Sequence, residues 1–173
     1  MNNTRHVHII KYTVYAVLLL ILYTLQTVPG LFAISGVKPI WVVPAAIAIA
    51  MMEGEFVGGI YGAAAGLLCD LGGFSLFGFK GFLVCLFSVG AGLLVIYLMH
   101  LSLRGCLLFT FLTLLTTGSL EHFFTLRMHG FADAWMVYAY SVLPTVGYSL
   151  LITPLMYYLV RALHRRFQAA LEQ

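Results

Sequence analysis

The residues best suited to metal chemistry lie close together in the second half of the chain. Glu121, His122, His129 and Asp133 carry the carboxylate and imidazole groups that commonly bind transition metals. Their spacing matches none of the ligand patterns of familiar metal sites. We therefore expect segment 125–133 to be an interfacial polar loop, the most hydrophilic internal loop of the chain, and we expect no metal.

The motifs of common enzyme classes are missing from the sequence. It contains no G-x-x-x-x-G-K-[ST], G-x-G-x-x-G, H-E-x-x-H or G-x-S-x-G motif. Ser35 and Lys38 have the spacing of a serine–lysine nucleophile pair, but the supporting motifs of that enzyme class are absent. The six acidic residues are too far apart for a convincing acid–base pair. These observations predict a protein without catalytic residues or cofactors.

Charge and cysteine content disfavour nucleic-acid binding, disulfides and zinc sites. The formal net charge is +3, and the nine Lys and Arg residues are scattered at the ends of apolar segments instead of forming a stripe. Anionic lipid headgroups are their more natural neighbours, and no nucleic acid is expected as a partner. The three cysteines lie within apolar runs without C-x-x-C spacing, as small packing residues do: Cys69, Cys85 and Cys106.

Asp70 is an acidic residue at the end of an otherwise apolar segment, just before Gly72 and Gly73. A carboxylate inside the hydrocarbon layer is costly, so it needs a partner or a position at the interface. Three interpretations are open: it caps the following turn through backbone N–H groups, it holds a loop that a partner or ligand touches, or it relays a proton or ion. Capping is the simplest. A relay has the least support, since no second acidic residue lies at mid-membrane depth.

Four glycines precede Asp70 at intervals of four residues, at Gly54, Gly58, Gly62 and Gly66. Positions four apart lie on one side of a helix and drift only slowly around it. Glycine removes side-chain bulk and lets a second backbone approach closely, as in the GxxxG contacts of membrane helices. The pattern predicts a helix-contact face. Packing within the bundle is the favoured interpretation, and contact with a different protein is the other.

These candidate residues must be positioned by membrane helices, because the composition excludes an ordinary soluble enzyme. The chain has 173 residues, of which 62% are hydrophobic and 9% charged, against roughly 25% charged in soluble domains. A spanning helix takes about 20 apolar residues, which leaves room for roughly six spans and no second domain. We predict an all-α integral membrane bundle with spans at 12–28, 39–52, 56–71, 81–99, 105–124 and 134–159.

Prolines and glycines set the expected ends and bends of these spans. Pro39 stands near the start of the second span, where a missing N–H costs little, and Pro44 is expected to tilt or kink that span. Pro144 and Pro154 are expected to interrupt the sixth span before a basic tail. Segment 72–80 is too apolar for an aqueous loop, so we expect it in the headgroup region or dipping into the membrane.

The distribution of Lys and Arg predicts the orientation of the chain. Six spans place both termini on one side, and positive charge is retained preferentially in the cytoplasm. The termini and the even-numbered loops carry Arg5, Lys11, Arg104, Arg161, Arg165 and Arg166, whereas the odd-numbered loops carry Lys38, Lys80 and Arg127. Six against three predicts that both termini are cytoplasmic.

A further pattern between positions 25 and 90 extends the glycine face on both sides. A proline opens the second predicted span, a glycine-rich third span ends in a Gly-Leu-x-x-Asp motif, and a phenylalanine-rich loop follows. In chain order the residues are Leu25-Gln26-Thr27, Lys38-Pro39-Ile40, Glu53-Gly54-Glu55, Gly58, Gly62, Gly66-Leu67-Leu68-Cys69-Asp70-Leu71, Gly73 and Phe77-Gly78.

This pattern resembles the core signature of the rod shape-determining protein MreD family. The resemblance implies a non-enzymatic, multi-pass subunit of the bacterial cell-elongation machinery, which builds side-wall peptidoglycan at the cytoplasmic membrane. It also implies association with the bitopic protein MreC. Through MreC, it implies association with the glycosyltransferase RodA, its class B penicillin-binding transpeptidase and the actin-like filament MreB.

The same resemblance supplies an alternative function. The MreD family resembles, in fold, the six-helix substrate-binding subunits of energy-coupling-factor vitamin transporters. A small-molecule binding subunit of an importer is therefore the second hypothesis, and nothing in the composition excludes a cavity lined by helices. Against it, the first span lacks the small-xxx-small pair typical of those subunits, although Ala46 and Ala50 provide one in the second span. The partner surface, the stoichiometry and any bound lipid or metabolite stay open.

Overall fold

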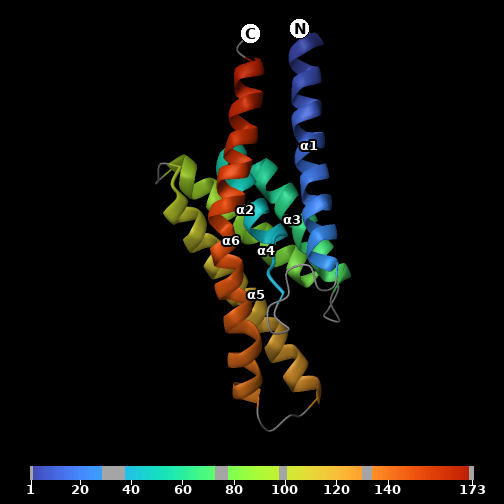
Figure 1. Cartoon of the computed structure of the whole chain (residues 1–173), viewed down its shortest axis with the longest axis vertical. Coiled ribbons are helices and arrows are strands. Elements are labelled where there is room, and N and C mark those ends of the chain that lie inside the picture. The colour runs from blue at the N-terminus through green and yellow to red at the C-terminus, as the bar shows by residue number, and fades with distance from the viewer. Residues whose placement is uncertain (1, 29–37, 73–77, 98–100, 130–133, 172–173) are drawn as a thin grey trace.

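The computed structural model describes residues 2–28, 38–72, 78–97, 101–129 and 134–171, and within these ranges the chain forms six helices and no strand. Successive helices run in alternate directions, so the two chain termini lie at the same end of the molecule, here called the terminal end (Figure 1). The opposite end is called the distal end. The prediction of an all-α fold is confirmed. The helices are α1 (Asn2–Thr27), α2 (Val42–Glu53), α3 (Glu55–Leu71), α4 (Phe79–Tyr97), α5 (Leu103–His129) and α6 (Ala134–Leu171).

Four of the six helices are long and apolar enough to cross a membrane. The spanning stretches are His6–Thr27, Phe79–Tyr97, Leu103–Glu121 and Val142–Ala169. With a rise of about 1.5 Å per residue, α2 and α3 reach only about 18 and 26 Å, less than the roughly 30 Å of a hydrocarbon core. The chain thus has the character of a membrane protein, with two shorter helices among the four longer ones.

The short helix α2 is the centre of the bundle. Every residue from Val42 to Met51 is buried, and α2 contacts each of the other five helices. Alanine, valine and isoleucine make it apolar on all sides, which is the pattern of a helix surrounded by other helices. Pro44 lies in its first turn, where no backbone N–H is required, so the helix runs through it to Glu53. Pro39 lies before the helix, and the second span begins later than predicted.

The prolines of the last helix do not interrupt it, contrary to the prediction. α6 continues through Pro144 and Pro154 and includes the basic segment that was expected to be a tail. Hydroxyl groups supply additional hydrogen bonds along this stretch, because Ser149 Oγ donates to Thr145 O at 2.7 Å and Thr153 Oγ1 donates to Ser149 O at 2.9 Å. The packing of neighbouring helices against α6 is what lets a membrane helix tolerate proline.

Two predicted loops are partly helical. α5 runs to His129, so most of the segment 125–133 is not a loop; the sequence has neither glycine nor proline between Gly118 and Gly130 to stop the helix. α4 begins at Phe79, inside the predicted 72–80 loop, and the question of whether that loop enters the membrane falls on residues 73–77, outside the described residues. At the distal end the α5–α6 hairpin extends past the other helices (Figure 1).

Candidate functional site

The glycine face of α3 begins at a sharp reversal between α2 and α3. Gly54 joins the two helices with φ +93° and ψ 179°, a backbone conformation that is essentially restricted to glycine. One turn later, a Cβ added at Gly58 would overlap the Cβ of Ala50 and lie 2.6 Å from its Cα. Glycine at both positions therefore lets α3 fold back closely on α2.

Further along α3, the glycines face α4. A Cβ added at Gly62 would lie 2.6 Å from the Cβ of Ser88, and one at Gly66 would lie 2.5 Å from the Cα of Gly81. These separations are too short for real carbon atoms, so the two helices approach as closely as their backbones allow. Of the two interpretations of the glycine face, the structure shows packing within the bundle.

Asp70 joins the end of α3 to the start of α4. Its Oδ2 accepts hydrogen bonds from the backbone N–H groups of Gly78 at 2.8 Å and Gly81 at 3.3 Å. The residue is only 3% exposed, and the N–H groups at the start of a helix need such an acceptor. The carboxylate therefore caps α4, as the simplest of the three interpretations expects. Its Oδ1 is buried without a hydrogen-bond partner among the described residues.

The remaining residues of the signature frame the same region. Gly78 has φ +91°, which favours glycine, and this conformation presents its N–H to Asp70. Pro39 is buried ahead of α2 and lines a cavity described below. Gly73 and Phe77 lie outside the described residues.

A buried ionic cluster around Glu53 is not predicted by any pattern in the sequence. Glu53 Oε1 lies 2.6 Å from Lys11 Nζ, 2.6 Å from His164 Nδ1 and 2.8 Å from the hydroxyl of Tyr15, which donates to it. Lys11 and Tyr15 come from α1 and His164 from α6, so one carboxylate oxygen connects three helices. In the sequence, Lys11 and Glu53 each lie beside an apolar run. They are far apart in the chain, so no helical spacing connects them.

The Glu53 cluster changes the interpretation of Lys11. The charge pattern of the sequence places this lysine outside the membrane, whereas the structure buries it to 2% exposure. A buried charge is tolerated only when it is paired and hydrogen-bonded. The cluster lies toward the terminal end, and its evident role is to fix α1 and α6 against α2.

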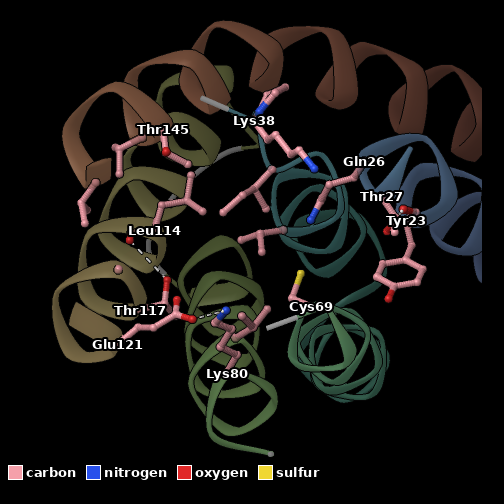
Figure 2. A pocket seen from close by; sticks show the side chains of 18 residues that line it. Tyr23, Gln26, Thr27, Lys38, Cys69, Lys80, Leu114, Thr117, Glu121 and Thr145 are labelled. Carbon is pink, nitrogen blue, oxygen red and sulfur yellow. Dashed lines mark hydrogen bonds and ion pairs between the residues drawn. The ribbon is translucent and has the colours of Figure 1, made fainter. Parts of the chain in front are cut away.

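A cavity of about 660 Å³ lies toward the distal end, and residues of all six helices line it. Figure 2 shows polar side chains on two opposite sides of it: Tyr23, Gln26, Thr27 and Lys38 on one, and Thr117, Glu121 and Lys80 on the other. Lys80 Nζ and Glu121 Oε1 form an ion pair at 2.8 Å. The remaining surface is largely aliphatic, from Val43, Val84, Leu114, Val142 and Val146.

The cavity brings together residues that no sequence motif connects. Glu121 is one of the candidate metal ligands, but the structure pairs it with Lys80. The side chains of His122 and His129, and Asp133 as a whole, lie outside the described residues. In the part of the chain that the structure describes, no group of three or more His, Cys, Asp or Glu is arranged to hold a metal ion.

Comparison with known proteins finds no relative of this chain. No protein-family model matches the chain, and neither a curated protein nor a solved structure matches it.

Proposed function

We propose that the chain is a non-enzymatic membrane subunit of the bacterial cell-elongation machinery, similar to the MreD family. The observation that carries the proposal is that the residues of the family-like signature form one packed unit. Gly58 contacts α2, Gly62 and Gly66 contact α4, and Asp70 caps α4. A pattern whose members act together in this way is better explained by a shared fold than by chance glycines in apolar helices.

The proposed role is that of a scaffold in the cytoplasmic membrane with both termini in the cytoplasm. Six helices of alternating direction agree with this topology (Figure 1). The glycine face is occupied by α2 and α4, so a bitopic MreC-like partner has to contact faces that the bundle leaves exposed. A RodA-type glycosyltransferase, its class B penicillin-binding protein and an MreB filament would associate directly or through that partner.

Affinity purification in a mild detergent tests this proposal. We expect a bitopic protein with a coiled-coil segment to co-purify, together with the synthases of side-wall peptidoglycan. Depletion is expected to make a rod-shaped host round. Normal rods after complete depletion, in a host without a second copy, would contradict the proposal.

The alternative, a small-molecule binding subunit of an energy-coupling-factor importer, is favoured by one observation. The cavity of about 660 Å³ is within the range of about 300–1,000 Å³ that is usual for small-molecule sites. In the same purification, an ATPase pair together with a second membrane subunit would favour the importer. Uptake of a vitamin that depends on this chain would support it independently.

A further inference from the structure

The position of the cavity relative to the membrane helices carries an inference beyond the proposed scaffold. The cavity lies beside the last residues of α1, the end of α3 and the start of α4, where Thr27, Gly72 and Lys80 line it. Residues of α5 and α6 close its other side. The cavity is thus enclosed by all of the helices, and the ligand class follows from the side chains that line it.

The charged side chains of the cavity favour an anion. Two lysines and one glutamate line it, a net charge of +1: Lys38, Lys80 and Glu121. The ion pair between Lys80 and Glu121 compensates one positive charge, and these side chains are only 17% and 34% exposed. Lys38 is exposed on the opposite side of the cavity (Figure 2), so its ammonium group is accessible to a ligand.

The backbone beside Lys38 is held firmly in place. The following residue, Pro39, is buried and has a fixed φ. Ile40 N–H then donates to Ser149 Oγ on α6 at 2.9 Å, and Trp41 N–H donates to Gln26 Oε1 on α1 at 3.0 Å. The chain therefore enters α2 along a path fixed by two other helices, which positions the base of the lysine side chain at the rim.

Between the two polar sides, the cavity is bounded by aliphatic side chains. Val43, Val84, Leu114, Val142 and Val146 come from four different helices and form a surface suited to hydrocarbon. We infer that the cavity binds an anionic amphiphile, a molecule in which one phosphate or carboxylate is joined to an apolar body. Lys38 binds the anionic group, and the aliphatic surface takes the apolar part. This inference does not depend on which proteins assemble with the chain.

Binding of dodecyl phosphate to the purified full-length protein in a neutral detergent tests the inference. Isothermal titration calorimetry is expected to show saturable binding of this probe. Dodecanol has the same apolar chain without the charge, and inorganic phosphate has the charge without the chain. We expect both to bind at least about tenfold more weakly, because a charge-assisted hydrogen bond and the burial of the chain each contribute about 1.4 kcal/mol or more.

Two variants locate the site, and a third serves as control. Lys38→Gln is expected to weaken binding of dodecyl phosphate about tenfold, with little effect on the fold because the side chain is exposed. Arg104→Gln removes an exposed cation away from the cavity and should leave binding unchanged. Val146→Phe places a ring in the cavity and should abolish saturable binding, with the melting temperature used to verify that the protein is still folded.

The source of the ligand is distinguished by a lipid arm. The protein is reconstituted with phosphatidylglycerol and phosphatidylcholine, and the lipids that stay bound are identified by native mass spectrometry. If phosphatidylglycerol is retained selectively and Lys38→Gln abolishes this selectivity, the ligand is a membrane lipid. Binding of dodecyl phosphate without retention of phosphatidylglycerol identifies a free amphiphilic acid. Equal binding of dodecanol and dodecyl phosphate, or binding unaffected by both Lys38→Gln and Val146→Phe, would overturn the inference.

Discussion

Lys11 on α1 and Glu53 at the end of α2 form an ion pair with 2.6 Å between Nζ and Oε1, and their side chains are only 3% and 7% exposed. Tyr15 and His164 approach the same carboxylate oxygen. A carboxylate at this depth needs these partners, and the partners in turn need the carboxylate. At the terminal end of the bundle, the helices are therefore held together by buried polar groups that neutralise and hydrogen-bond one another.

Replacing Glu53 by Gln is expected to destabilise the protein strongly. The change leaves the buried ammonium of Lys11 without its counter-charge, which costs about 3–5 kcal/mol in buried ion pairs. Thermal unfolding of the purified protein in detergent measures the effect. Glu55→Gln is the control, since Glu55 lies in the first turn of α3 and its loss should cost only about 0.3–1 kcal/mol. The double variant Lys11→Met with Glu53→Gln should recover part of the loss, because no buried charge is left unpaired.

Substitution of Gly62 should show how tightly α3 and α4 pack. Gly62→Ala places a Cβ 2.5 Å from Ser88 Oγ and 3.0 Å from the carbonyl oxygen of Val84, so the helices must separate. We expect a loss of about 1–3 kcal/mol, and a larger loss for Gly62→Ile. Unfolding in detergent and the amount of protein in the membrane are the measurements.

The matched control for Gly62 is Gly147 on α6. A Cβ there meets no atom within 4 Å, and alanine favours helix by up to about 1 kcal/mol over glycine. Gly147→Ala should therefore be neutral or stabilising. If Gly62→Ala were equally well tolerated, this result would contradict the close contact between α3 and α4 at Gly62.

Changing Asp70 should loosen the start of α4. Asp70→Ala removes the acceptor for the N–H groups of Gly78 and Gly81, and loss of a helix cap costs about 0.5–2 kcal/mol. Asp70→Asn keeps one acceptor oxygen and should cost less. Hydrogen exchange at the two amides is the specific measurement, because it should accelerate in Asp70→Ala more than in Asp70→Asn. Unchanged exchange in Asp70→Ala would contradict the capping role and return attention to the other two interpretations.

The sequence predicted the helices well and the central position of α2 poorly. Long runs of apolar residues between charges define a membrane helix almost by composition, so the number and order of helices follow from the pattern. α2 is recognisable as apolar, but only the structure shows that it is surrounded by the other five helices. The prolines of α6 were a source of error, because Pro144 and Pro154 fall within a helix that its neighbours support.

The two polar sites differ in how far the sequence could predict them. The glycine face and Asp70 follow from local spacing, because residues four apart share a helix side whatever the tertiary structure. The Glu53 cluster joins α1, α2 and α6, and the pair of Lys80 and Glu121 joins α4 and α5. Such contacts between distant segments depend on how the helices assemble, and a single sequence carries no periodic signal for them.

The last prediction concerns orientation, and the structure alters the charge count behind it. Lys11 is neutralised by Glu53, and Lys80 is paired with Glu121. Without these two lysines, the terminal side keeps five of its six basic residues and the other side two of its three. The bias therefore persists, and we expect both termini in the cytoplasm. Reporters fused after Gln173 and after His129 should report opposite compartments, because α6 separates these positions. The same compartment for both would mean that α6 does not cross the membrane.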